Sequence, residues 1–142
     1  MNKLLAVSKT SCQKKRGNKM EYVLVIPGKL HNLNDYIYAE RTNRYVGSQM
    51  KKADQELIIQ YVKQQLKGIK IEKPVFMEYT WYEINKQRDK DNISSYGRKI
   101  IQDGLVGSGV LQGDGWNNID GFSDTFEVDK ENPRVEVRII EV

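Results

Sequence analysis

The chain of 142 residues is poor in the residues that most often carry nucleophilic or metal chemistry. Its single cysteine, Cys12, excludes an internal disulfide and favours a reducing compartment. Its single histidine, His31, argues against a zinc site and against a histidine-based nucleophilic mechanism. No apolar run approaches the roughly 18 residues that would predict a membrane span. An enzyme built from this sequence would therefore depend on carboxylates, lysine and a metal ion.

The composition predicts a soluble globular chain, but its positive charge is unevenly distributed. Hydrophobic residues make up 39% and charged residues 30%, with a net charge of +4. Residues 1–19 contain six cations and no acid, so the remainder holds 17 cations against 19 acids. This predicts a basic, poorly ordered arm over residues 1–19 and one domain over residues 20–142. Such an arm would suit nucleic-acid phosphates. It could equally be a solubilising or vector-derived tail, because Met20 could serve as a translation start.

Hydrophobic periodicity predicts an α/β domain, which is a mixed sheet of about four or five strands packed with two main helices. The predicted strands cover residues 21–26, 75–84, 119–128 and 134–140, with the last two forming a hairpin around a turn at residues 129–133. One predicted helix covers residues 48–67 after an N-cap at Ser48. The other covers residues 93–105 after an N-cap at Asn92.

Residues 29–47 are predicted as a long loop in which tyrosine and arginine alternate with asparagine. Aromatic rings can stack on splayed bases, and arginine can bind phosphate. The loop therefore offers candidate DNA contacts, as does the outer face of the following helix, although the loop could be packed for its own stability and the helix face merely solvated. The candidates are Asn34, Tyr36, Arg41, Arg44, Lys51 and Lys52.

An Asp-x-Asp pair, Asp89 and Asp91, stands where the predicted strand ends and the second helix begins. Two carboxylates this close repel each other unless a cation lies between them. A few hard oxygen ligands, completed by substrate phosphate, suit Mg²⁺ or Mn²⁺. The pair therefore indicates a metal site that faces a phosphate ester, although aspartate also commonly caps helices and stabilises turns.

Two residues farther along could complete such a site. At about 100° per residue, Lys99 shares a helical face with Asn92 and Asp103. Lys99 could contact a phosphate or orient an attacking water, or it could simply pair with Asp103 four residues later. Asp114 is flanked by glycines that would allow it to approach the first pair closely, but it could also be an ordinary turn residue.

These motifs together resemble the RusA family of Holliday junction resolvases, which phages and prophages encode. The resemblance covers residues 75–127 and rests on Arg88-Asp89-Lys90-Asp91-Asn92, on residues 99–105 and on residues 109–114. It implies a magnesium-dependent endonuclease, with Mn²⁺ as a possible substitute, that acts on four-way DNA junctions as a homodimer in the cytoplasm of a bacterium or phage-infected cell. It implies that Asp89, Asp91 and Asp114 are the catalytic metal ligands and that Lys99 is essential. Arg88 would contact the DNA backbone or pair with Asp89.

The chain also departs from the family pattern. Gly113 stands where the best-known member has a second acid, and the interval from Asp91 to Lys99 is about one helical turn longer, or about 5 Å. Two other functions therefore remain open. One is a non-catalytic protein that binds branched DNA, and the other is a metal-dependent nuclease for flaps or replication forks.

Overall fold

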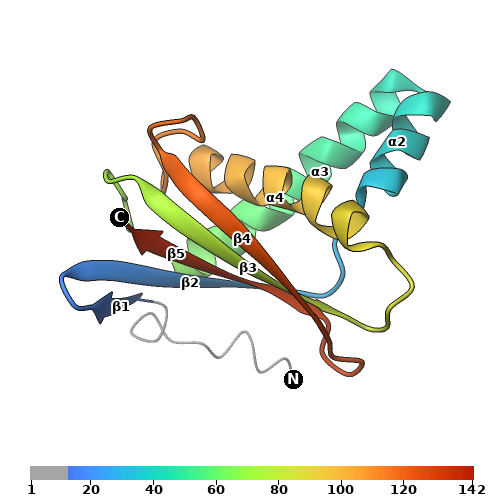
Figure 1. Ribbon diagram of the computed structural model, residues 1–142. Coiled ribbons are helices and arrows are strands. Elements are labelled where there is room, and N and C mark those ends of the chain that lie inside the picture. The colour runs from blue at the N-terminus through green and yellow to red at the C-terminus, as the bar shows by residue number, and fades with distance from the viewer. Residues whose placement is uncertain (1–12) are drawn as a thin grey trace.

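The computed structural model describes residues 13–142, which form an α+β fold with helices on one face of a mixed sheet (Figure 1). The strands of this part of the chain are β1 (Gln13–Arg16), β2 (Lys19–Pro27), β3 (Val75–Glu83), β4 (Ile119–Val128) and β5 (Arg134–Glu141). Its helices are α2 (Leu33–Thr42), α3 (Arg44–Gln65) and α4 (Lys90–Gly107). The predicted fold class is confirmed, with α2 added to the two expected helices.

The five strands of this sheet lie in the order β1-β2-β5-β3-β4, and only β3 and β4 are parallel. The predicted hairpin between residues 119–128 and 134–140 is therefore wrong, since β3 lies between β4 and β5. The chain crosses the end of β3 after leaving β4, where the Asp129 N–H donates to the Glu83 carbonyl at 2.8 Å. Because β3 and β4 are parallel, α4 serves as their crossover connection.

The core explains why α4 has a fixed position. The side chains of β3 alternate between the helix-covered face and the other face, and those that face the helices are buried. A Cβ atom at Gly97 of α4 would lie only 2.6 Å from the Trp81 ring, so only glycine allows this close approach. The fully buried apolar residues of the sheet and helices include Leu24, Ile26, Ile58, Met77, Tyr79, Trp81, Ile100, Ile101, Leu105 and Ile139. Each contributes roughly 1.5–3 kcal/mol by leaving water, an upper-bound transfer value.

The predicted loop at residues 29–47 is correct only for residues 29–32, because the residues that follow form α2 and the first turn of α3. Two asparagines in this range are helix N-caps. Asn32 caps α2 in a capping box with Asp35, and the Asn43 side chain accepts from the Tyr45 N–H at the start of α3. The predicted cap at Ser48 is therefore also wrong, since α3 begins four residues earlier.

The predicted N-terminal arm is partly a strand. Gln13–Arg16 pair with the start of β2, whereas residues 1–12 lie outside the described residues. Beyond β1, the edge of β2 is closed by the side chain of Gln65, which accepts from the Val25 N–H at 2.8 Å and donates to the Val25 carbonyl at 2.6 Å. Among the helices of residues 13–142, none combines the length and the apolar character that a bilayer crossing requires.

Candidate functional site

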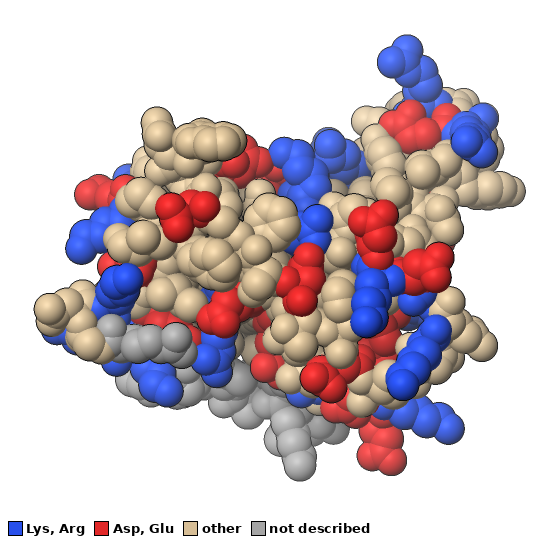
Figure 2. Space-filling view, in the orientation of Figure 1, with Lys and Arg blue, Asp and Glu red and all other residues tan. Residues whose placement is uncertain are grey.

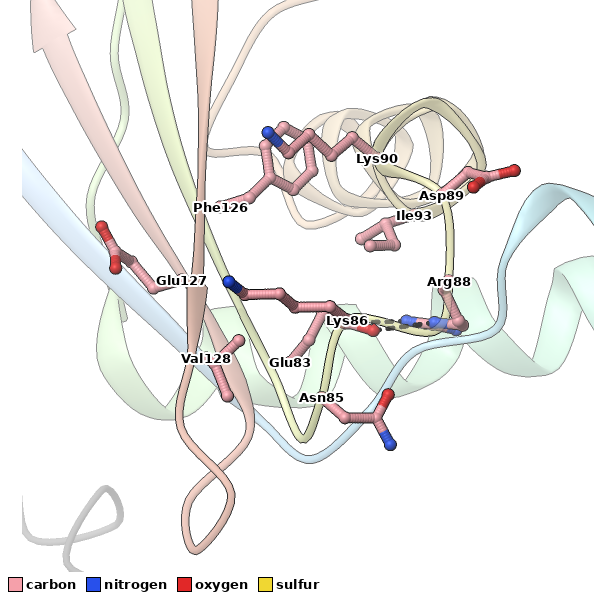
Figure 3. A pocket seen from close by; sticks show the side chains of 10 residues that line it. All are labelled: Glu83, Asn85, Lys86, Arg88, Asp89, Lys90, Ile93, Phe126, Glu127 and Val128. Atoms are coloured by element: carbon pink, nitrogen blue, oxygen red, sulfur yellow. Dashed lines mark hydrogen bonds and ion pairs between the residues drawn. The ribbon is translucent and has the colours of Figure 1, made fainter.

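A buried ion pair holds the turn that connects β3 to α4. The Arg88 guanidinium donates from Nε to Glu83 Oε1 at 2.8 Å and from Nη2 to Glu83 Oε2 at 2.9 Å (Figure 3). It also donates from Nη1 to the Leu30 carbonyl at 3.0 Å. The expected alternative pairing of Arg88 with Asp89 is wrong, since its partner is Glu83. The contact of Arg88 with DNA remains a prediction, but the donors of this side chain are directed into the protein.

Asp89 and Asp91 stand at the N-terminus of α4, as the sequence predicted. Asp89 occupies the N-cap position, yet its side chain makes no capping bond, and Asp91 lies in the first turn. Both residues are exposed, and within residues 13–142 neither carboxylate has a hydrogen-bond or ion-pair partner. The positive end of the helix dipole tolerates both charges. Both carboxylates are therefore exposed to solvent at the start of α4.

Asn92 is not the N-cap of this helix, because α4 begins two residues earlier. Its side chain has another role, since its Oδ1 accepts from the Asn34 N–H at 2.8 Å. This bond joins the first turn of α2 to the first turn of α4. Asn34 therefore lies beside the candidate site, and it contacts Asn92 through its backbone N–H.

A hollow of about 770 Å³ lies between the β3–α4 turn and β4 (Figure 3). The side chains of Lys86 and Lys90 reach across it toward β4, and Lys90 lies 5.7 Å from the centre of the Phe126 ring. The Asp89 carboxylate points away from the hollow. Lys86 and Lys90 therefore place positive charge on one side of the helix N-terminus, and the Asp89 carboxylate lies on the other side.

Lys99 and Asp114 meet in an exposed cluster farther along α4. The Lys99 Nζ lies 2.9 Å from Asp114 Oδ2 and 3.0 Å from Asp103 Oδ1. The hydrogen bond to Asp114 raises the pKa of Lys99, and the hydrogen bond from Lys99 lowers the pKa of Asp114. The expected i,i+4 pair with Asp103 is confirmed, and Lys99 binds the predicted third carboxylate as well. Lys99 is therefore a cation at neutral pH, oriented by two acids.

The three predicted metal ligands do not form one group. Asp91 and Lys99 are about 12 Å apart along the helix axis, and Asp114 is bound to Lys99. Within residues 13–142, no three side chains of histidine, cysteine, aspartate or glutamate form a cluster that could hold a metal ion. The expected close approach of Asp114 to the first pair is thus not observed. Asp89 and Asp91 by themselves suit Mg²⁺, which often takes one or two carboxylates and completes its shell with water and phosphate.

The topology of the sheet explains why Asp114 lies apart from Asp89 and Asp91. Asp89 follows the C-terminal end of β3, whereas Asp114 precedes the N-terminal end of β4. In a parallel pair the C-terminal end of one strand and the N-terminal end of the other are separated by the length of the strands. The expectation that glycines would bring Asp114 to the first pair did not take this crossover into account.

The other predicted DNA contacts lie on a helical hairpin formed by α2 and α3, which projects beyond the sheet (Figure 1). Arg41, Arg44 and Lys52 are exposed and Lys51 is half-buried. Blue side chains and red side chains both lie at the end of this projection (Figure 2). Tyr36 differs, because its ring stacks on Tyr96 at a centroid distance of 5.2 Å, and its hydroxyl donates to Glu40. Tyr36 therefore supports the hairpin with one face of its ring, and its contact with DNA remains a prediction.

A partly buried polar network ties this hairpin to α4 and was not foreseen from the sequence. Asp54 accepts from the Tyr96 hydroxyl at 2.8 Å, and its Oδ2 lies 2.9 Å from Nδ1 of His31. Burial raises the pKa of Tyr96, as does its bond to Asp54, so the hydroxyl remains a donor at neutral pH. The sequence separations of 42 and 23 residues left no local signal that could have revealed these contacts.

In comparisons with known proteins, no family model matches this chain, and no curated protein sequence matches it either. The resemblance to the RusA family therefore rests on the motif residues themselves, which lie in the β3–α4 turn, in α4 and in the loop after it.

Proposed function

We propose that this chain is a magnesium-dependent endonuclease that resolves four-way DNA junctions in recombination and repair. One observation carries the proposal: a single well-packed helix, α4, bears two unpartnered carboxylates at its start and a lysine that binds Asp114 farther along. The motif resemblance to RusA resolvases supports the same activity. The lysines beside Asp89 add positive charge where a DNA strand would pass.

Each residue of the site has a distinct task in this proposal. Asp89 and Asp91 would hold Mg²⁺, which lowers the pKa of a bound water and stabilises charge on the scissile phosphate. Lys99 would bind a phosphate oxygen of the DNA, and Asp114 would keep the ammonium group charged and oriented. Hydrolysis by in-line attack would leave a 3′-hydroxyl and a 5′-phosphate.

A homodimer suits this substrate. A four-way junction has near two-fold symmetry and requires two opposed cuts. A dimer with C2 symmetry would supply two identical sites through one interface.

A second candidate is a non-catalytic protein that binds branched DNA. Two observations favour it: the three predicted ligands do not form one group, and Gly113 occupies the place of an acid. Such a protein would use the cations of the hairpin and of the hollow without needing metal.

Cleavage of a synthetic mobile four-way junction in Mg²⁺ tests both candidates. We expect the wild type to make symmetric paired nicks and Asp91→Asn to lose at least about a hundredfold in rate, because a metal ligand is removed. Asp91→Asn should keep or improve DNA binding, since a negative charge near phosphate is gone. Glu131→Gln, which removes the same charge from the exposed turn between β4 and β5, is the matched control.

The outcomes separate the candidates. If the wild type and Asp91→Asn both bind the junction and neither cuts it in Mg²⁺ or Mn²⁺, the non-catalytic candidate is correct. Near-normal cleavage by Asp91→Asn would contradict the assignment of the site. Preferred cleavage of flaps or forks over junctions would identify a nuclease of different substrate choice.

A further inference from the structure

A tryptophan exposed almost completely to solvent stands two residues after Asp114. Trp116 is 96% exposed, whereas Trp81, the other tryptophan of the chain, is 1% exposed in the core. Tryptophan carries a large apolar surface that proteins normally cover at least in part. A second aromatic ring, Phe122, is also exposed, at 49%, and it lines the same hollow as Trp116, so the two rings together offer aromatic surface to a partner.

The backbone around Trp116 is held in place. The N–H groups of Asn118 and Ile119 both donate to the Gly115 carbonyl at 3.0 Å, which forms a tight turn. The Asn118 carbonyl in turn accepts from the Val75 N–H at 2.9 Å, which anchors the turn to β3. The indole is thus presented from a fixed turn and not from a loose loop.

A hollow of about 530 Å³ adjoins the indole. Two exposed aromatic residues, Trp116 and Phe122, contribute to its lining, and the Arg98 guanidinium lies 4.5 Å from the centre of the Phe122 ring. Its polar lining includes Gln102 and Asp114. Aromatic surfaces with polar groups at the margin suit a flat ring that has hydrogen-bonding edges.

We propose that this hollow binds one unpaired nucleobase, stacked on Trp116, from the DNA strand that the neighbouring site would cut. The proposal rests on the proposed function and deepens it by assigning a base-binding subsite. Every nucleobase has a π-face that stacks on an aromatic ring without regard to sequence. Paired bases inside a duplex are covered by their neighbours, whereas branch points and single strands expose them.

The position of the hollow supports a base in particular. Asp114 lines it and also binds Lys99, so a nucleotide whose base stacks on Trp116 would have its phosphate near the Lys99 ammonium group. The Gln102 amide already donates to the Tyr79 hydroxyl at 3.2 Å, and its oxygen has no partner among the described residues. That oxygen could accept a hydrogen bond from a base edge.

Tryptophan fluorescence can test the stack without any cleavage. A short single-stranded oligonucleotide is titrated into the protein in EDTA, beside the same oligonucleotide with abasic sites. We expect the normal oligonucleotide to quench the emission and the abasic one to leave it largely unchanged. Trp116→Phe should abolish the quenching, because only the buried Trp81 remains, yet it should keep the affinity within about threefold since phenylalanine also stacks. Trp116→Ala should weaken binding about tenfold.

The possible results separate this inference from the proposed function. Equal quenching by both oligonucleotides, or unchanged affinity of Trp116→Ala, would overturn the base-binding subsite even if wild type cuts junctions and Asp91→Asn does not. Base-dependent quenching by a protein that cuts no DNA would support the subsite and reject the nuclease. If Trp116→Ala changes the sedimentation of the protein but not its DNA affinity, the indole belongs to an interface between two copies, and the proposal fails.

Discussion

One ion pair lies at the start of α4 and another near its middle, and the two pairs differ mainly in their exposure to solvent. In the Glu83–Arg88 pair the two side chains are 11% and 14% exposed. In the Lys99–Asp114 pair the lysine is 55% exposed and the aspartate 34% exposed. The shortest N–O distances are nearly equal, at 2.8 and 2.9 Å. Distance alone therefore does not distinguish a structural pair from one that a substrate could use.

Exposure to solvent determines the free-energy cost of breaking each pair. A buried charge that loses its partner remains desolvated, so breaking a buried pair is costly. An exposed charge that loses its partner is solvated by water, so breaking an exposed pair costs little. The first pair is thus suited to fixing the β3–α4 turn, and the second can exchange its partner for a phosphate. Substitutions in the two pairs should therefore differ in their consequences for stability and for activity.

Arg88→Ala should destabilise the fold by about 3–5 kcal/mol, because Glu83 would be left buried and unpaired. Chemical denaturation with urea measures this change in the free energy of unfolding. The double variant Glu83→Gln, Arg88→Met is the control, since it removes both charges and should recover much of the loss. Equal destabilisation by the single and double variants would show that the charge pair is not what holds the turn.

Lys99→Ala should change the free energy of unfolding by less than about 1 kcal/mol, since its pair is exposed. Junction cleavage should nevertheless fall at least about tenfold, because a phosphate-binding cation is removed. Lys130→Ala, an exposed lysine in the turn after β4, is the matched control. Unchanged cleavage by Lys99→Ala would reduce Lys99 to an ordinary surface lysine.

The smallest effect should appear in the pH dependence of stability. The hydrogen bond from Lys99 lowers the pKa of Asp114, so this contribution is complete above the usual aspartate pKa of about 3.9. It should disappear as the pH falls through the lower pKa of the folded state. The stability difference between the wild type and Asp114→Asn should therefore shrink on acidification. In Lys99→Ala the pKa of Asp114, followed by NMR, should return toward its ordinary value, and a pKa that stays low would contradict this origin of the shift.

The sequence predicted those parts of the fold that have strong local patterns. The apolar run of β2, the aromatic β3 and the amphipathic α4 all appear close to their expected limits. The Asp-x-Asp pair was placed at a strand-to-helix junction, as observed, because the change of periodicity occurs there. The i,i+4 contact between Lys99 and Asp103 also followed from helical spacing alone.

The errors concern features that depend on distant parts of the chain. Asparagines at 32 and 43 look like loop residues in isolation, and only the helices that follow them identify them as caps. β4 and β5 are adjacent in sequence, but β3 pairs with both, which no local pattern reveals. The separation of Asp114 from Asp89 and Asp91 follows from the same crossover. The partner of Arg88 was missed because Glu83 is also the last residue of a buried strand.

The spacing between Asp91 and Lys99 on α4 sets the length of DNA that the proposed site would cover. Asp91 and Lys99 stand about 12 Å apart along the axis, and successive base pairs rise about 3.4 Å, so a strand lying along α4 would meet these side chains about three to four nucleotides apart. Asp91 would hold the metal ion at the point of cleavage, and Lys99 would bind a phosphate of the same strand a fixed distance away. A footprint of this length would favour DNA that stays extended past the cut.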